Sequence, residues 1–75
     1  MTNWKSLVGG NIRRLRLAKG LTQEQLAFEA KIDVTYVGGI ERGVRNPSLL
    51  VMVRIADALE AGLADFIVGR DVPQR

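Results

Sequence analysis

The stretch from residue 20 to residue 43, GLTQEQLAFEAKIDVTYVGGIERG, decides the fold of this 75-residue chain. Thr22 and Gln25 fit a capping box, in which each side chain accepts a hydrogen bond from the other residue's backbone N–H. A polar break follows, and Asp33 is a favourable N-cap for a second helix that Gly43 ends. The pattern therefore predicts two short helices joined by a tight turn.

The apolar positions fit a sharp bend between these two helices over residues 22–42. The positions that such a bend buries are apolar, and the point of closest helix approach carries a small residue. The chain fills them with Leu26, Ala27, Ala30, Ile32, Val37 and Ile40. The turn position that usually holds glycine with a positive φ is Lys31, which costs about 1 kcal/mol. Residues 22–42 are accordingly predicted to form a helix-turn-helix.

The remaining helix caps, glycines and apolar spacing predict three more helices and no strand. Three-to-four spacing from Leu7 to Ala18 indicates a first helix, weakened in its first turn by two glycines and ended by Gly20. A fourth helix is expected from a cap at Ser48 or Asn46 to about residue 60, and a fifth over about 63–68. The class is all-α with five helices in a single domain, 1–75, and the tail 69–75 is expected to be frayed.

The fourth helix is unusually apolar. Arg54, Asp57 and Glu60 form one narrow polar stripe, so the rest of its circumference is expected to be covered by protein.

Composition argues against an enzyme. The chain has no cysteine and no histidine, which removes disulfides, the usual zinc ligands and the usual general base. We expect no metal, no cofactor and no small-molecule ligand. The longest apolar run, 49–53, is far below membrane-spanning length, so a cytoplasmic protein is expected.

The charge is unevenly placed along the chain. Residues 1–45 carry eight bases and four acids, whereas residues 46–75 carry three bases and four acids, within a total of +3. A basic first part and a nearly neutral, apolar second part suggest one half that faces a polyanion and another that packs or self-associates.

Three segments resemble the Xre, or lambda-repressor-like, family of helix-turn-helix regulators. They are IRRLRLAKGLTQEQLA at 12–27, TYVGGIERGVRNPS at 35–48 and VMVRIADAL at 51–59. The resemblance implies a compact five-helix fold and binding to double-stranded DNA. The short length and the stretch 33–47 are similar to controller proteins of restriction–modification systems.

The resemblance also implies which residues contact DNA. The first turns of the third helix supply base contacts, here Val34, Thr35, Tyr36 and Gly39. Phosphate contacts are expected from Gln23, Lys31, Arg42, Arg45 and Asn46. Tyr36 could instead cover the core, and Asn46 could be a turn or cap residue. Gly39, like Gly38, could instead permit close approach of the helix to the DNA backbone or to a neighbouring helix. Arg16 and Glu41 match a structural ion pair beneath the DNA-binding surface.

Self-association is the remaining expectation. Such domains commonly bind palindromes as symmetric dimers, so a palindromic operator and a homodimer are expected. The apolar fourth helix and the residues after it, 48–68, are the predicted dimer surface. Its interface candidates are Leu63, Phe66, Ile67 and Val68, although Phe66 could instead fill the core, and Trp4 could cover either the core or the dimer seam. Alternative interpretations are an antitoxin-type protein-interaction module and a phage-type repressor.

Overall fold

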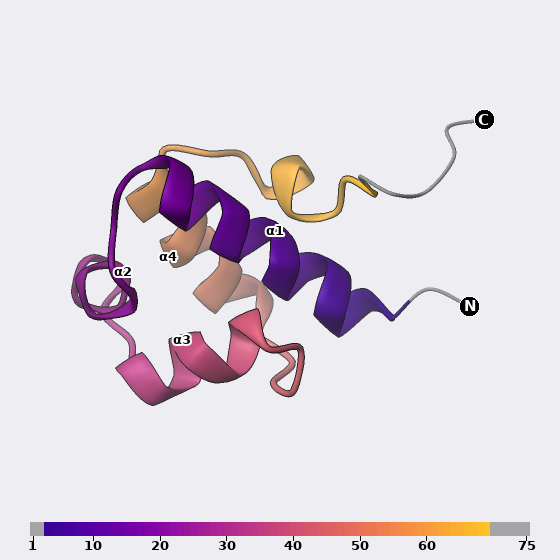
Figure 1. Ribbon diagram of the computed structural model, residues 1–75, viewed down its shortest axis with the longest axis horizontal. Coiled ribbons are helices and arrows are strands. Elements are labelled where there is room, and N and C mark those ends of the chain that lie inside the picture. Colours follow the sequence, from indigo (N-terminus) through magenta and orange to yellow (C-terminus); the bar gives the residue numbers. More distant parts are fainter. Residues whose placement is uncertain (1–2, 70–75) are drawn as a thin grey trace.

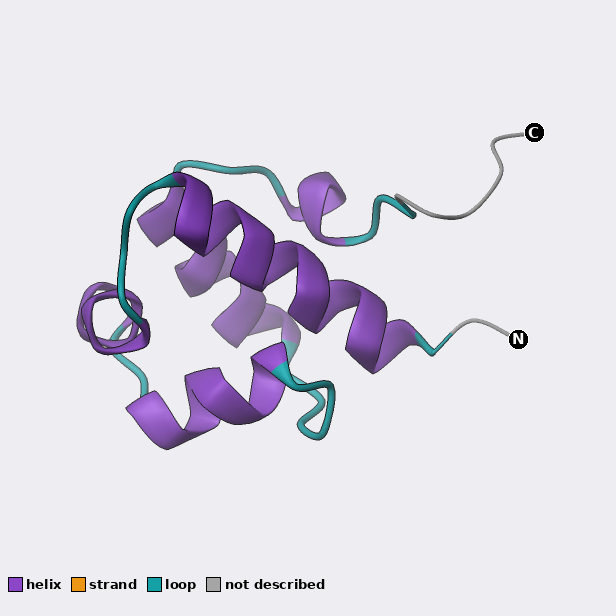
Figure 2. Cartoon of the chain, viewed as in Figure 1, coloured by secondary structure: helices purple, strands orange, loops and turns teal. Residues whose placement is uncertain are grey.

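The computed structural model describes residues 3–69, so residues 70–75 of the predicted frayed tail lie outside the described range. The elements follow in the order α1 (Trp4–Ala18), α2 (Gln23–Ala30), α3 (Val34–Glu41), α4 (Leu49–Leu59) and the 3-10 helix η1 (Leu63–Phe66). Residues 3–69 contain no strand (Figure 2), which confirms the all-α class. α1 runs through the centre of Figure 1 and packs against α3, α4 and η1, while α2 packs against α3 and α4.

Local side-chain caps start the helices where the sequence predicts. Thr22 Oγ1 accepts from the Gln25 N–H at 3.0 Å, and Gln25 Oε1 accepts from the Thr22 N–H at 2.8 Å, which completes the capping box. Asp33 Oδ1 accepts from the Thr35 N–H at 2.7 Å, and Ser48 Oγ accepts from the Val51 N–H at 3.1 Å. Each cap satisfies an N–H that has no partner within its own helix.

The bend between α2 and α3 has the predicted core. Leu26, Ala27, Ala30, Val37 and Ile40 are buried, and Ile32 is half-buried against them. Lys31 ends α2 in the left-handed conformation, with φ 61° and ψ 46°. The sequence therefore predicted both the helix-turn-helix and the strained residue in its turn. Ile12, Ile55 and Phe66 extend the same core from the other elements.

α1 begins earlier than the sequence indicates. Asn3 caps it by accepting from the Ser6 N–H at 3.2 Å, so the helix starts at Trp4 and the two glycines lie in its middle. Gly9 faces the end of α3 so closely that a Cβ there would lie 1.9 Å from the Ile40 carbonyl oxygen. Gly10 faces open space. The backbone contact of α1 with α3 therefore requires glycine at position 9 alone.

The predicted fifth α-helix is wrong in type and extent. Residues 63–66 form a four-residue 3-10 helix, and the described part of the chain has four α-helices, not five. Asn11, buried in α1, donates from Nδ2 to the carbonyl oxygens of Phe66 and Val68, both at 2.9 Å. These two hydrogen bonds fasten the segment after α4 to α1.

α4 is less completely covered than its composition suggests. Ile55, Ala56 and Leu59 are buried, but Leu49 and Leu50 in its first turn are 64% and 60% exposed. Glu60 ends the helix with φ 54°, and its carboxylate accepts from Lys19 Nζ at 2.6 Å. This hydrogen bond lowers the pKa of Glu60.

No helix within residues 3–69 is long and apolar enough to cross a bilayer.

Candidate nucleic-acid interface

The first turn of α3 carries three of the residues that are predicted to contact DNA bases. Because Asp33 occupies the N-cap, the next three residues form the first turn of the helix. Val34 and Thr35 are exposed, whereas Tyr36 is half-buried and packs against the core. Thr35 offers a hydroxyl that can donate and accept, and Val34 offers methyl groups that can contact a thymine methyl. Tyr36 combines a packing role with a partly exposed ring.

The predicted base contact of Gly39 is wrong, because this residue lacks the exposed surface that such a contact needs. It is buried, and a Cβ on it would lie 2.5 Å from Cγ of Arg45. Gly38 is also buried, with the Arg42 guanidinium and the Gln23 amide over it; a Cβ there would lie 3.2 Å from Arg42 Nη1. The two glycines thus lie beneath polar side chains that the sequence assigned to phosphate contacts.

A buried polar network supports this surface from below. Arg16 Nε donates to Glu41 Oε2 at 2.6 Å and Arg16 Nη2 donates to Glu41 Oε1 at 3.0 Å, a bidentate pair with both side chains buried. Arg16 Nη1 also donates to the Leu21 carbonyl oxygen at 2.8 Å. The hydrogen bond to Glu41 raises the pKa of Arg16. The predicted ion pair is present and ties α1 to α3, while Arg16 also holds Leu21 in the turn between α1 and α2.

Gln23 belongs to the same network, and the sequence did not predict this role. Its Nε2 donates to Glu41 Oε1 at 3.0 Å, so its side chain is held across the start of α2 towards α3. Because the partner is 18 residues away, no local signal could identify it. The first-turn N–H groups of α2 and the positive end of its dipole still favour an anion at this position.

Three of the predicted phosphate-contact residues gather at the end of α3 and in the loop that follows. Arg42 is the C-cap of α3, Arg45 crosses Gly39, and Asn46 lies next in the loop; all three are exposed. Gly43, with φ 78°, reverses the chain between them. With Gln23 across from Arg42, these side chains flank the α3 surface on the side of Gly38 and Gly39.

Lys31 lies apart from this group. It follows the C-terminal end of α2, about 12 Å along the helix from Gln23 at its start, and it lines a shallow hollow with Arg54 and Asp57 of α4. The structure places Lys31 beside α4 and does not bring it to the arginines that follow α3.

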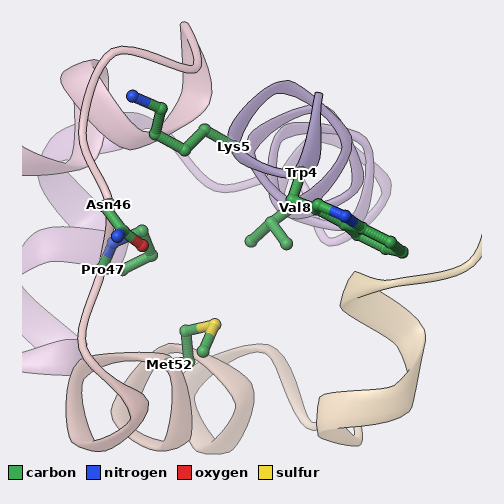
Figure 3. A pocket seen from close by; sticks show the side chains of 6 residues that line it. All are labelled: Trp4, Lys5, Val8, Asn46, Pro47 and Met52. Carbon is green, nitrogen blue, oxygen red and sulfur yellow. The ribbon is translucent and has the colours of Figure 1, made fainter. Parts of the chain in front are cut away.

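Asn46 also borders a small hollow of about 90 Å³ between α1, the loop and α4 (Figure 3). Trp4, Val8 and Met52 line the hollow as well, and Trp4 remains 60% exposed. Trp4 therefore lies at the edge of this hollow and does not cover the core.

The predicted dimer surface needs one correction. Phe66 is completely buried among the core residues, so it has no area to offer a second subunit. Leu63, Ile67 and Val68 are 38%, 56% and 47% exposed and remain available. Leu49 and Leu50 form a second exposed apolar pair, which also lies within the predicted dimer surface 48–68.

A capped, exposed helix following a sharp turn, flanked by arginines and supported by a buried ion pair, defines a helix-turn-helix DNA-binding domain. The chain matches the helix-turn-helix family over residues 12–66 and belongs to that Xre-like family.

Its relatives include controller proteins of restriction–modification systems. It is 45% identical to the control protein C.BamHI of Bacillus amyloliquefaciens over 66 residues, which are 87% of this chain and 82% of the relative. The crystal structure of the controller protein C.AhdI of Aeromonas hydrophila matches with a TM-score of 0.81 and 45% identity over 83% of this chain and 94% of the other. A tetramer of the controller protein C.Esp1396I in complex with its natural 35 base-pair operator matches with a TM-score of 0.78 and 38% identity, covering 88% and 87% of the two chains.

Proposed function

We propose that this protein is a sequence-specific, DNA-binding transcriptional regulator that binds a palindromic operator as a homodimer. The observation that carries the proposal is the exposed first turn of α3, Asp33-capped, with Arg42 and Arg45 beside it. A helix of this kind fits the major groove, and the flanking cations meet the phosphates on either side. The control-protein relatives support a role in regulating restriction–modification genes, in the cytoplasm.

The residues divide into base-reading and phosphate-contacting groups. Val34 and Thr35 read base edges through methyl and hydroxyl groups, and Tyr36 contributes the exposed part of its ring. Gln23, Arg42, Arg45 and Asn46 contact the sugar-phosphate backbone and set the orientation of α3 in the groove. Lys31, at the far end of α2, adds to the same electrostatic attraction.

The dimer places two reading helices on one DNA duplex. A C2 interface uses the same patch on both subunits, and Leu63, Ile67 and Val68 supply exposed apolar area outside the reading surface. One domain then covers one half-site, and the operator repeats that half-site with inverted symmetry.

Fluorescence anisotropy tests the DNA-binding function with a labelled duplex from the region upstream of the protein's own gene, titrated at several salt concentrations. We expect binding that weakens steeply with salt, and a preference for this duplex over one of scrambled sequence. Thr35→Ala should relax that preference, while Arg54→Ala, on the polar stripe of α4, should leave it unchanged. Absence of binding at every salt concentration would contradict the proposal, and salt-dependent binding without preference would indicate an architectural DNA-binding protein.

A further inference from the structure

The Gly39 carbonyl oxygen holds the loop after α3 against the helix. The backbone N–H groups of Val44 and Arg45 both donate to the Gly39 carbonyl oxygen, at 3.0 and 3.2 Å. Gly43 allows the reversal by adopting φ 78°, which strains residues other than glycine. The loop therefore folds back beside the C-terminal half of α3 (Figure 1), and the backbone of Arg45 is fixed there.

Gly39 also determines where the side chain of Arg45 lies. Its stem occupies the position where Gly39 would carry a side chain: a Cβ at 39 would lie 2.5 Å from Arg45 Cγ and 3.5 Å from Arg45 Nε. Contacts under 3 Å between such carbons do not occur, so alanine at 39 would force the stem away. Glycine inside a helix lowers helix stability, and here its presence leaves room for an arginine.

Gly38 differs from Gly39 in this respect. A Cβ at 38 would approach Arg42 only at Nη1, the flexible end of that side chain, and at the longer distance of 3.2 Å. Arg42 can move its guanidinium by a few tenths of an ångström, whereas Arg45 would have to change the direction of its stem.

We propose that Gly39 is a positioning residue for Arg45, which it holds along α3 so that the guanidinium contacts a DNA phosphate beside the reading helix. The inference rests on the proposed DNA-binding function and assigns Gly39 a part in it through Arg45. A guanidinium binds phosphate with a planar pair of N–H donors, so the direction of the stem matters. Fixing that stem before binding reduces the entropy lost on contact.

The first test uses the free protein and needs no DNA. In a solution NMR spectrum, nuclear Overhauser effects should connect the Gly39 Hα protons with the Cγ and Cδ protons of Arg45. Their absence would overturn the proposal, because it would mean that Arg45 does not lie over Gly39 before DNA binds.

The second test measures DNA affinity and its salt dependence with a fluorescein-labelled duplex recovered by selection from random DNA with the wild-type protein. Arg45→Ala should weaken binding about tenfold and reduce the salt slope by about 0.9 for each protomer bound. Gly39→Ala should produce the same loss and the same slope, although it leaves Arg45 in the chain. In the Arg45→Ala background, Gly39→Ala should add no further loss, because the Cβ of residue 45 stays 3.6 Å from the new methyl group.

Gly10→Ala is the matched control for glycine replacement inside a helix, since a Cβ at position 10 meets nothing within 4 Å. It should raise the melting temperature by about 2–8 °C and leave DNA affinity unchanged. Gly39→Ala should not lower the melting temperature, which separates its effect on binding from any loss of fold.

The outcomes distinguish this inference from the proposed function. Wild-type protein that binds no DNA would overturn both. Wild-type binding with an unaffected Gly39→Ala variant, or with losses that multiply in the double variant, would overturn the role of Gly39 alone. A loss confined to one base position, with an unchanged salt slope, would overturn the assignment of Arg45 to a phosphate.

Discussion

At the scale of single residues, two neighbouring glycines in α1 have opposite surroundings. Gly9 lies against the end of α3, where a Cβ would come 1.9 Å from the Ile40 carbonyl oxygen, while a Cβ at position 10 would reach only open space. The obstacle at position 9 is backbone, which cannot rotate away as a side chain can. The same substitution at adjacent positions should therefore change stability in opposite directions.

We expect Gly9→Ala to destabilise the fold by about 3 kcal/mol, because α1 and α3 must separate to admit the methyl group. Gly10→Ala should instead stabilise it by about 0.5–1 kcal/mol through improved helix propensity. Urea denaturation followed by circular dichroism measures both. Equal effects of the two variants would contradict the close approach of α1 to α3.

The buried ion pair gives a second prediction at this scale. Glu41→Ala removes the acceptor of Arg16 Nε, Arg16 Nη2 and Gln23 Nε2 together, and leaves a buried guanidinium unpaired. The expected loss is about 3–5 kcal/mol, a large part of the stability of so small a domain. Thermal denaturation should show it.

The matched control for Glu41→Ala removes both charges at once. Arg16→Met combined with Glu41→Leu should cost much less than Glu41→Ala, because no buried charge remains without a partner. If the single and the double variant lost the same stability, the pair would have no electrostatic role in the fold.

At the scale of helices and turns, the sequence predicted the starts of α2, α3 and α4, because hydrogen bonds between near neighbours in the chain determine them. The caps at Thr22, Asp33 and Ser48 involve residues two or three positions away, and each forms as expected. Residues 63–66 form a 3-10 helix in place of the predicted fifth α-helix, and the segment is held by Asn11, which is 55 residues away from Phe66 and gives no local signal. The covering of Gly39 by Arg45 likewise depends on how the loop folds back on α3.

The turn between α2 and α3 carries a prediction of its own. Lys31 holds φ 61°, a conformation that costs a residue with a Cβ about 1–2 kcal/mol. Lys31→Gly should therefore raise the free energy of unfolding by about 1 kcal/mol, a value that urea denaturation can measure. An unchanged or lowered value would mean that contacts of the lysine side chain outweigh the strain.

The same variant tests the proposed phosphate contact of Lys31. Its position beside α4 and away from the arginines that follow α3 leads us to expect a smaller loss of DNA affinity than Arg45→Ala produces, about threefold or less. Anisotropy titrations of the two variants against one duplex give the comparison. A loss equal to that of Arg45→Ala would place Lys31 among the main contacts.

At the scale of the whole molecule, the excess of positive charge lies in residues 1–45, whereas exposed apolar side chains occur in both parts of the chain, from Phe28 in α2 to Ile67 after η1. The proposed DNA-binding residues lie between 23 and 46, in the part with the positive charge, while Leu63, Ile67 and Val68 lie in the nearly neutral part. The division into a DNA-contacting part and a self-associating part remains a prediction. The sequence left Phe66 open between the core and the interface, because residues 63–68 share an apolar character, and the packing of η1 on α1 buries it. Three exposed apolar residues therefore remain for a second copy of the chain.

A charged side chain within this surface should convert the proposed dimer to a monomer. Ile67→Glu would place a carboxylate in the proposed apolar contact, where its desolvation would oppose association. We expect the dissociation constant of the dimer to rise at least tenfold, and sedimentation equilibrium measures it. Because a monomer contacts one half-site only, the salt slope on a palindromic duplex should fall to about half of its wild-type value. Leu50→Glu makes the same change at the exposed start of α4 and serves as the comparison. A protein that stays dimeric with glutamate at 67, and becomes monomeric with glutamate at 50, would move the interface from η1 and its following residues to the first turn of α4.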